Sequence, residues 1–194
     1  MASFAFDARR HEYVDEDAGE VLPHITGMLE RSGWVDDRWF TEESCERGSI
    51  VHRLSADYDL GAIENVESVT SQYKPWLLAH VKGIGLVRPE WTHVEIPLVS
   101  AVYRYGGRPD RCGLMYGAVA VAEIKSGPIG KAHAIQTALQ AILLAPEVGL
   151  PAEAIHRYGW YVTGRGKFRL EQFVARADFD AAYTVIRQTC GVMV

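Results

Sequence analysis

The segment from Gly117 to Lys125 constrains the fold more than any other part of the chain. It reads Gly-Ala-Val-Ala-Val-Ala-Glu-Ile-Lys, an almost unbroken run of small and β-branched apolar residues that ends in a Glu and a Lys. Such a short apolar run is typical of a strand that is buried on both faces of its sheet. After a break at Gly127-Pro128, a helix is predicted from about Lys131 to Leu144. Its apolar stripe recurs at helical spacing: Ile135, Ala138, Leu139, Ile142 and Leu143.

Further strands are predicted on both sides of this segment. Alternation of apolar and polar residues predicts a strand from His93 to Val99. Ala101–Tyr105 and Arg108–Met115 are predicted as two strands joined by a tight turn at Gly106-Gly107. The C-terminal part is predicted as a hairpin of Arg157–Val162 and Phe168–Val174, then a helix over Asp178–Thr189 with Asp178 as its N-cap.

Helices are predicted for most of the N-terminal part. A small hairpin around the turn-prone Asp15–Gly19 precedes helices over Ile25–Arg31 and about Glu42–Leu60. Asn65 is predicted to cap a third helix that runs towards His80 and is interrupted or restarted at Pro75. This order of elements predicts an α/β fold, an α/β/α sandwich with a central mixed β-sheet flanked by helices.

Composition limits the classes of protein that remain. No repeat or linker divides the chain, so we expect one domain over residues 1–194, with a helical part over about 1–85 and the sheet over about 88–194. No run of about 18 apolar residues is present, and Met1–Arg10 lacks the apolar core of a signal peptide, so we expect a cytoplasmic protein. Three widely spaced cysteines favour reduced thiols over a disulfide framework or a zinc site.

The charges are distributed unevenly. Residues 1–70 hold 6 basic and 16 acidic residues, whereas residues 71–194 hold 14 basic and 9 acidic residues, which together give the net charge of −5. Such asymmetry is compatible with one basic face on an acidic protein, and phosphate contacts need local Lys and Arg rather than a basic total. An acidic, solvated surface on the N-terminal half accounts for the charges equally well.

The charged end of the apolar strand is the first candidate for chemistry. Side chains alternate along a strand, so Glu123 and Lys125 point to the same face, roughly 6–7 Å apart. Asp110 lies thirteen residues before Glu123 and follows two glycines and Pro109. If the two strands pair as neighbours, Asp110 and Glu123 converge into an oxygen-ligand site suited to Mg²⁺ or Mn²⁺. A strand-end ion pair that extends into solvent is the alternative for Glu123 and Lys125.

The order of several motifs resembles that of the PD-(D/E)xK nucleases. Pro109-Asp110 and Glu123-Ile124-Lys125 are similar to the signature of that superfamily. Arg47–His52, Leu22–Leu29 and Tyr105–Asp110 resemble conserved segments of its RecB-like and phage-exonuclease branch, and Gln136 occupies the place of the first residue in that branch's QxxxY motif. The resemblance covers about residues 11–145. It implies a restriction-endonuclease-like core and a nuclease activity on DNA.

The resemblance also implies roles for individual residues. Asp110, Glu123 and Lys125 would be catalytic; the ligands of Mg²⁺ or Mn²⁺ would be Asp110, Glu123, His52 and the backbone carbonyl of Ile124. Glu95 and Gln136 would support the site. Residues expected to contact DNA are Thr26, Arg108, Lys131, Gln140 and Arg165. Ordinary alternatives stand beside these roles: a solvated His52, a solvent-facing Glu95, and a polar helix face around Gln136 that only meets water.

Two departures from the family pattern narrow the expectation. Gln140 stands where the branch has the tyrosine of its motif, and the cysteines of iron–sulfur members are missing, so we expect no iron–sulfur cluster. We expect an exonuclease in recombination, repair or phage DNA processing, in contact with DNA and no membrane, as a homo-oligomer or with a repair partner protein. The rival hypothesis is a non-catalytic module on the same fold that binds DNA or a protein. Another kind of α/β enzyme ranks behind both, because no glycine-rich phosphate loop, G-x-S-x-G or HExxH motif is present.

Overall fold

The computed structural model describes residues 3–10, 12–35 and 41–192. Its centre is a five-stranded mixed sheet with the strand order β10-β9-β8-β7-β4. The strands are β4 (Glu90–Val94), β7 (Arg111–Met115), β8 (Ala118–Lys125), β9 (His156–Val162) and β10 (Phe168–Gln172). Only β8 and β9 pair in parallel, and the other neighbours are antiparallel. The predicted α/β sandwich with a mixed sheet is confirmed.

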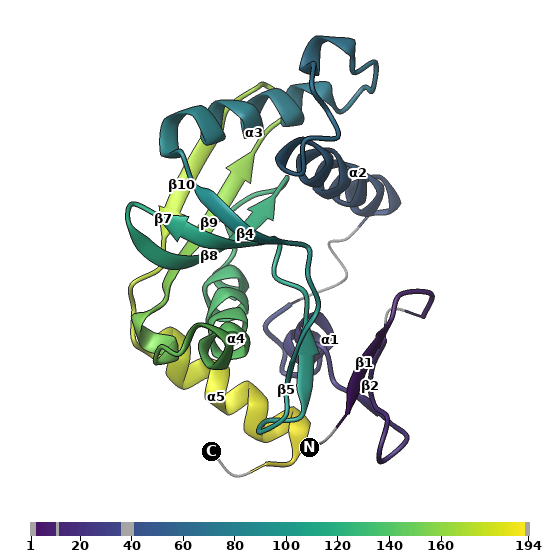
Figure 1. The fold of residues 1–194 in the computed structure, drawn as a ribbon, viewed down its shortest axis with the longest axis vertical. Coiled ribbons are helices and arrows are strands. Elements are labelled where there is room, and N and C mark those ends of the chain that lie inside the picture. Colours follow the sequence, from purple (N-terminus) through teal and green to yellow (C-terminus); the bar gives the residue numbers. More distant parts are fainter. Residues whose placement is uncertain (1–2, 11, 36–40, 193–194) are drawn as a thin grey trace.

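Helices cover both faces of this sheet (Figure 1). One face packs against α1 (Ile25–Arg31), α4 (Lys131–Val148) and α5 (Ala177–Cys190). The other face packs against α2 (Glu42–Asp59) and α3 (Lys74–Val87). Within the described part of the chain, no helix is both long enough and apolar enough to span a lipid bilayer.

The alternation of β8 divides the core into two layers. Val121 lies in the cluster beneath α4 and α5, whereas Ala120, Ala122 and Ile124 lie in the cluster beneath α2 and α3. The predicted buried strand is thus confirmed, and its small side chains let helices approach both faces. Glu123 and Lys125 follow Val121 on the α4 side because the alternation has a period of two residues.

The predicted turn at Gly106-Gly107 is wrong. These glycines lie in β6 (Tyr105–Gly107), which pairs with β5 (Leu98–Ser100) in a separate hairpin, and the chain reverses over residues 101–104 instead. The physical reason is packing: a Cβ on Gly106 would lie 2.2 Å from the Tyr13 ring, and one on Gly107 would lie 2.4 Å from Ile25. The glycines serve close contact, and Arg104 (φ 53°) takes the left-handed backbone conformation of the turn.

Two predicted helix starts also differ from the structure. Asn65 caps only a short 3-10 turn, Val66–Ser68, whereas the predicted restart near Pro75 is confirmed, since α3 begins at Lys74 and continues past His80 to Val87. Pro75 is tolerated there because the first turn has no intrahelical partner for its missing N–H. Asp178 lies inside α5 and is not its N-cap, because its carboxylate accepts a hydrogen bond from Arg157 at 2.9 Å.

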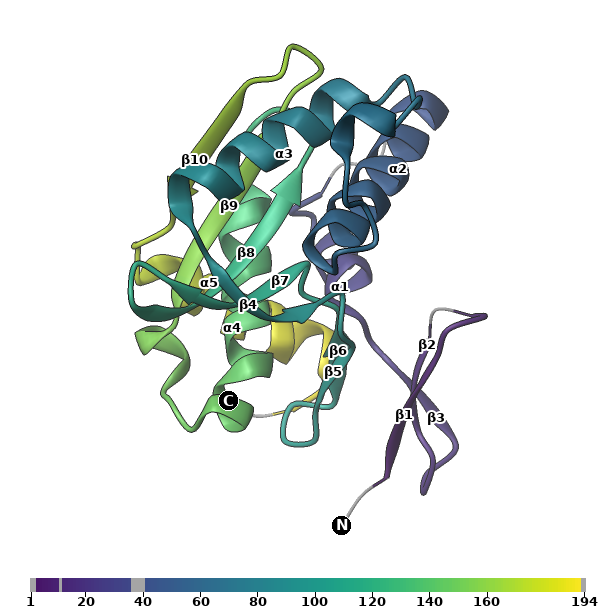
Figure 2. The same cartoon turned by 45° about the horizontal axis from the view of Figure 1, so that its top comes forward.

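A second small sheet projects from the body of the protein (Figure 2). It contains β1 (Phe4–Asp7), β2 (Glu12–Asp15) and β3 (Glu20–Leu22), of which only β2 and β3 belong to the predicted hairpin. Tyr13 of β2, which is 2% exposed, packs against Gly106 and joins this sheet to the body. Residues 1–85 therefore contain the expected hairpin and helices, and β1 is the strand that was not expected.

Candidate functional site

The β7–β8 hairpin brings two carboxylates together. Asp110 directly precedes β7, and Glu123 lies near the end of β8, where Arg111 pairs with Ala122. The Asp110 Oδ2 atom accepts a hydrogen bond from the Ile124 N–H at 2.6 Å, which fixes the side chain across the hairpin. Asp110 is 4% exposed and Glu123 is 3% exposed. Because burial of two carboxylates without cationic partners is costly, their surroundings decide what this site can do.

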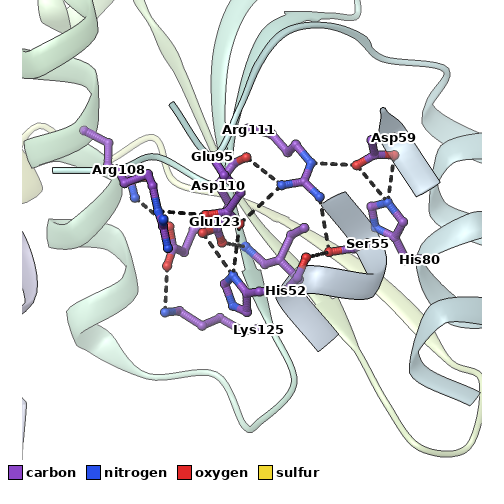
Figure 3. Close-up of polar contacts among 12 residues, drawn as sticks. His52, Ser55, Asp59, His80, Glu95, Arg108, Asp110, Arg111, Glu123 and Lys125 are labelled. Carbon is purple, nitrogen blue, oxygen red and sulfur yellow. Dashed lines mark hydrogen bonds and ion pairs between the residues drawn. The ribbon is translucent and has the colours of Figure 1, made fainter. Parts of the chain in front are cut away.

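His52 and Glu95 approach Asp110 from two other elements. His52 extends from α2, and its Nδ1 atom lies 3.1 Å from Asp110 Oδ1 and 3.4 Å from Glu95 Oε1. Glu95 follows β4 in the left-handed backbone region (φ 55°), and its N–H donates to the Asp110 carbonyl. This conformation is uncommon for a residue other than glycine, and it turns the Glu95 side chain towards Asp110 (Figure 3).

The group of His52, Glu95 and Asp110 could hold a metal ion. One ligand atom from each residue lies within 4.8 Å of the other two. Among the described residues, the buried Glu95 Oε1 atom has only long contacts, with His52 Nδ1 at 3.4 Å and Arg111 Nη1 at 3.5 Å. An acceptor of this kind next to a second carboxylate and an imidazole suits a divalent cation with mixed oxygen and nitrogen ligands. The chemistry of the donor set therefore fits a metal.

Glu123 is held from the opposite side by helix α4. Its Oε1 atom accepts hydrogen bonds from Gln136 Nε2 at 2.6 Å and from Lys125 Nζ at 2.9 Å. Its Oε2 atom accepts one from Gln140 Nε2 at 2.5 Å. The two glutamines lie four residues apart and so share one face of α4, where both reach the same carboxylate.

Gln140 was expected to contact DNA, and the structure places it elsewhere in the site. It is 1% exposed, and its amide group is directed at Glu123. A direct contact with DNA stays a prediction for this residue. The sequence did indicate that Gln136 and Gln140 share one face of α4, because they lie four residues apart. It did not indicate the direction of the Gln140 amide.

The charges of the site shift the pKa values of its bases. Burial lowers the pKa of His52, but the negative charge of Asp110 and hydrogen bonds to Asp110 and Glu95 outweigh this and raise it to about 10. Burial likewise opposes the charged form of Lys125, whereas Glu123 and Asp110 raise its pKa overall. Both side chains are therefore cationic at neutral pH in the absence of a metal.

His133, in the first turn of α4, behaves in the opposite way. Burial and the nearby charge of Lys125 lower its pKa to about 4, against the weaker influence of Glu123. Its Nδ1 atom accepts a hydrogen bond from the Gly130 N–H at 3.2 Å and lies 2.9 Å from the Tyr161 hydroxyl. A neutral imidazole therefore stands beside the Lys125 ammonium.

The sequence analysis missed a buried network behind Asp110. The Arg111 guanidinium is fully buried and contacts Asp59 at 2.6 Å, while Asp59 also contacts His80 at 2.9 Å (Figure 3). No local pattern joins these positions, because they come from α2, α3 and β7. The one available sign was an arginine at the start of the apolar segment Cys112–Met115.

The site opens into a cavity of about 710 Å³. Its lining includes His52, Glu95, Asp110, Glu123, Lys125, Gln136 and Gln140. Thr26 and Arg108, both expected to contact DNA, line the same cavity, and Arg108 also pairs with Glu95 at 3.1 Å. Lys131 and Arg165, the other two expected contacts, are exposed and do not line it. The structure therefore gathers the core of the expected site at one cavity and leaves two of the cations outside.

Comparisons with known proteins add little to this picture. No protein-family model and no curated protein matches the sequence. Among solved structures, a protein from Eubacterium rectale described as a "Putative exonuclease" is similar with a TM-score of 0.49 and 15% identity, over 84% of this chain and 69% of that chain. A protein named SSO0001 is similar with a TM-score of 0.37 and 17% identity, over 85% and 82% of the two chains. Both scores lie below 0.5, so the functional argument depends on the residues of the site.

Proposed function

We propose that this protein is a metal-dependent nuclease that hydrolyses phosphodiester bonds in DNA, and that it belongs to the RecB-like, phage-exonuclease branch of the PD-(D/E)xK enzymes. The observation that carries the proposal is the convergence of Asp110, Glu123 and Lys125 at one end of the β7–β8 hairpin, open to a cavity that His52 also lines. Hydrolysis of a phosphodiester requires a cation, an activated water and a positive group near the phosphate. The carboxylates and His52 can bind the cation, the cation can activate a water, and Lys125 is the positive group.

The residues that would hold Mg²⁺ or Mn²⁺ are Asp110, Glu123, His52 and the Ile124 carbonyl, with Glu95 beside them. The bound ion would polarise a phosphate oxygen and lower the pKa of a water molecule bound to the ion. His52 is cationic without a metal, since its pKa is raised to about 10, so it must lose a proton before its Nδ1 can bind a cation. Binding of the ion is therefore coupled to release of a proton.

Lys125 acts as a positive group in this proposal. Because Glu123 and Asp110 raise its pKa, it is an ammonium at neutral pH and has no lone pair with which to accept a proton. It therefore orients the attacked phosphate and offsets the charge that grows on it in the transition state. Glu123 holds Lys125 at 2.9 Å, and Gln136 and Gln140 hold Glu123.

Two further residues would guide the substrate. Thr26 and Arg108 line the cavity, and we assign them to the DNA backbone. Lys131 and Arg165 do not line the cavity, and we assign them to DNA farther from the scissile bond.

The test is cleavage of linear and circular DNA, single- and double-stranded, with Mg²⁺, Mn²⁺ or EDTA. We expect wild type to cut only with metal and Lys125→Ala to lose about 100- to 1,000-fold in rate. Lys82→Ala is the matched control, because Lys82 is exposed on α3 and does not line the cavity. Sparing of circles would assign an exonuclease. DNA binding without any cleavage by wild type would instead support the non-catalytic module.

A further inference from the structure

The buried Arg111 occupies a special place behind the candidate metal group. Its guanidinium is fully shielded from solvent, and each of its three nitrogens has a partner. The Nε atom contacts Asp59 at 2.6 Å, Nη1 donates to the Asp110 carbonyl at 2.6 Å, and Nη2 donates to the Ser55 hydroxyl at 3.2 Å. These three hydrogen bonds, one on each nitrogen, fix the orientation of the planar fork.

These contacts reach all three residues of the metal group. Asp110 is contacted through its backbone carbonyl, and Glu95 Oε1 lies 3.5 Å from Nη1. His52 is reached through Ser55, whose hydroxyl donates to the His52 carbonyl at 2.9 Å. A single guanidinium thus ties the helix that carries His52 to the strand that follows Asp110 (Figure 3).

Stability alone gives little reason for this arrangement. Arg111 lies in β7 opposite Ala122 and Val94, and its charge is balanced by Asp59, whose side chain is also buried. Replacing a buried ion pair with apolar residues of similar volume is often neutral or stabilising. A planar group with several fixed donors does, however, set the geometry between the elements it joins, which a flexible apolar side chain cannot do.

We infer that Arg111 is a positioning residue, which fixes the distance between His52 on α2 and Asp110, the residue before β7, and so presets the metal group for its cation. The inference rests on the proposed function, since it assigns a role in the same site. Arg111 itself does not line the cavity. Its effect on the reaction therefore acts through the placement of His52, Glu95 and Asp110.

The experiment compares two buried arginines. Arg111→Lys keeps the charge but loses the fork. Arg157→Lys is the matched control, because Arg157 is 2% exposed and its guanidinium bonds Asp178 and the carbonyls of Ala134 and Ala175, away from the metal group. For each protein we would measure Mn²⁺ affinity from the electron paramagnetic resonance signal of free Mn²⁺, unfolding in urea, and kcat and KM on linear DNA.

We expect Arg111→Lys to weaken Mn²⁺ binding by about 10- to 100-fold and to lower kcat with little change in KM for DNA. Arg157→Lys should lower stability and leave the Mn²⁺ affinity within about twofold. Ser55→Ala removes only the connection to His52 and should weaken Mn²⁺ binding by about threefold. If Arg111→Lys does not fold, the Mn²⁺ affinity of Ser55→Ala tests the inference in its place.

Equal Mn²⁺ affinity in wild type, Arg111→Lys and Ser55→Ala would overturn the inference and leave the nuclease proposal standing. Equal loss of Mn²⁺ affinity in Arg111→Lys and Arg157→Lys would also overturn it, because a general loosening of the fold would then explain the effect. Absence of Mn²⁺ binding by wild type would overturn the proposed metal site and this inference together.

Discussion

The two carboxylates of the β7–β8 hairpin are held by different kinds of neighbour. On the charged wall, which we define as His52, Asp59, Glu95, Asp110 and Arg111, acidic and basic side chains neutralise one another. On the amide wall, defined as Glu123, Gln136 and Gln140, neutral carboxamides donate to the carboxylate and Lys125 supplies the one cation. Residues of both walls line the same cavity, with Asp59 and Arg111 behind the charged wall, but the side chains of the two walls are held by different kinds of interaction.

The difference assigns the two walls different parts in binding a cation. On the amide wall, two neutral amides orient Glu123, and the Lys125 ammonium, 2.9 Å from its Oε1 atom, balances its charge. On the charged wall, the His52 imidazolium already supplies positive charge to Asp110, because its pKa is raised to about 10. When a metal ion binds, His52 loses its proton, and the metal ion replaces the positive charge of the imidazolium. The charged wall is therefore where binding of a cation is coupled to the loss of a proton.

The largest expected effect is on the charged wall. Asp59→Ala removes the partner of both Arg111 and His80 and leaves a buried charge unpaired. We expect the free energy of unfolding to fall by about 3–5 kcal/mol, measured by urea denaturation. Glu171→Ala, which breaks the surface pair with Arg169, is the control and should change stability by less than about 0.5 kcal/mol. A loss below about 1 kcal/mol in Asp59→Ala would show that the charged wall does not depend on its charges.

A smaller effect is expected on the amide wall, with an asymmetry between its two glutamines. Gln140 is the only donor to Glu123 Oε2 among the hydrogen bonds of the described residues, whereas Oε1 accepts from both Gln136 and Lys125. We expect Gln140→Leu to lower the cleavage rate about 10- to 100-fold and Gln136→Leu to lower it less. Single-turnover cleavage at saturating metal measures the difference. The reverse order would mean that Gln136 contributes through DNA and not through Glu123.

The smallest effect concerns pH and the neutral imidazole beside the amide wall. The pKa of His133 falls from 6.5 to about 4 in the folded protein, so the unfolded chain binds the proton more tightly. Stability is therefore lost as pH falls from about 6.5 towards 4, by about 1 kcal/mol between pH 7 and pH 5 after allowance for screening.

His133→Asn tests this pH dependence because it retains an acceptor near the position of Nδ1 and removes the titrating group. Urea denaturation at pH 7 and pH 5 should then show a smaller loss of stability for the variant than for wild type. Equal losses in both proteins would assign the pH dependence to other groups.

Much of the amide wall could be predicted from the sequence, because it follows from local periodicity. A period of two placed Glu123 and Lys125 on one face of β8, and a period of 3.6 placed Gln136 and Gln140 on one face of α4. The pairing of β7 with β8 followed from their closeness along the chain. What the pattern did not show was the direction of the Gln140 amide, which depends on how α4 packs against the sheet.

The charged wall could be predicted only in part. His52 and Asp110 were identified through motif resemblance, whereas the contact of Arg111 with Asp59 joins positions that no period connects. The misplaced turn at Gly106-Gly107 has a related cause, since glycine is required both where the backbone turns and where another side chain must come close. Which of the two applies depends on Tyr13 and Ile25, residues from distant segments.

The bond between Arg111 and Asp59 has a consequence for the order in which the site is lost on partial unfolding. It spans 52 residues of chain, whereas the bond from Ile124 to Asp110 spans 14. Closing the longer loop costs about 1 kcal/mol more chain entropy. Detachment of α2 would carry His52 away and leave the hairpin with Asp110 and Glu123 paired. We therefore expect the amide hydrogens of α2 to exchange with solvent in a local opening that leaves the β7–β8 hairpin intact. His52 would then separate from Asp110 and Glu123 before the sheet unfolds.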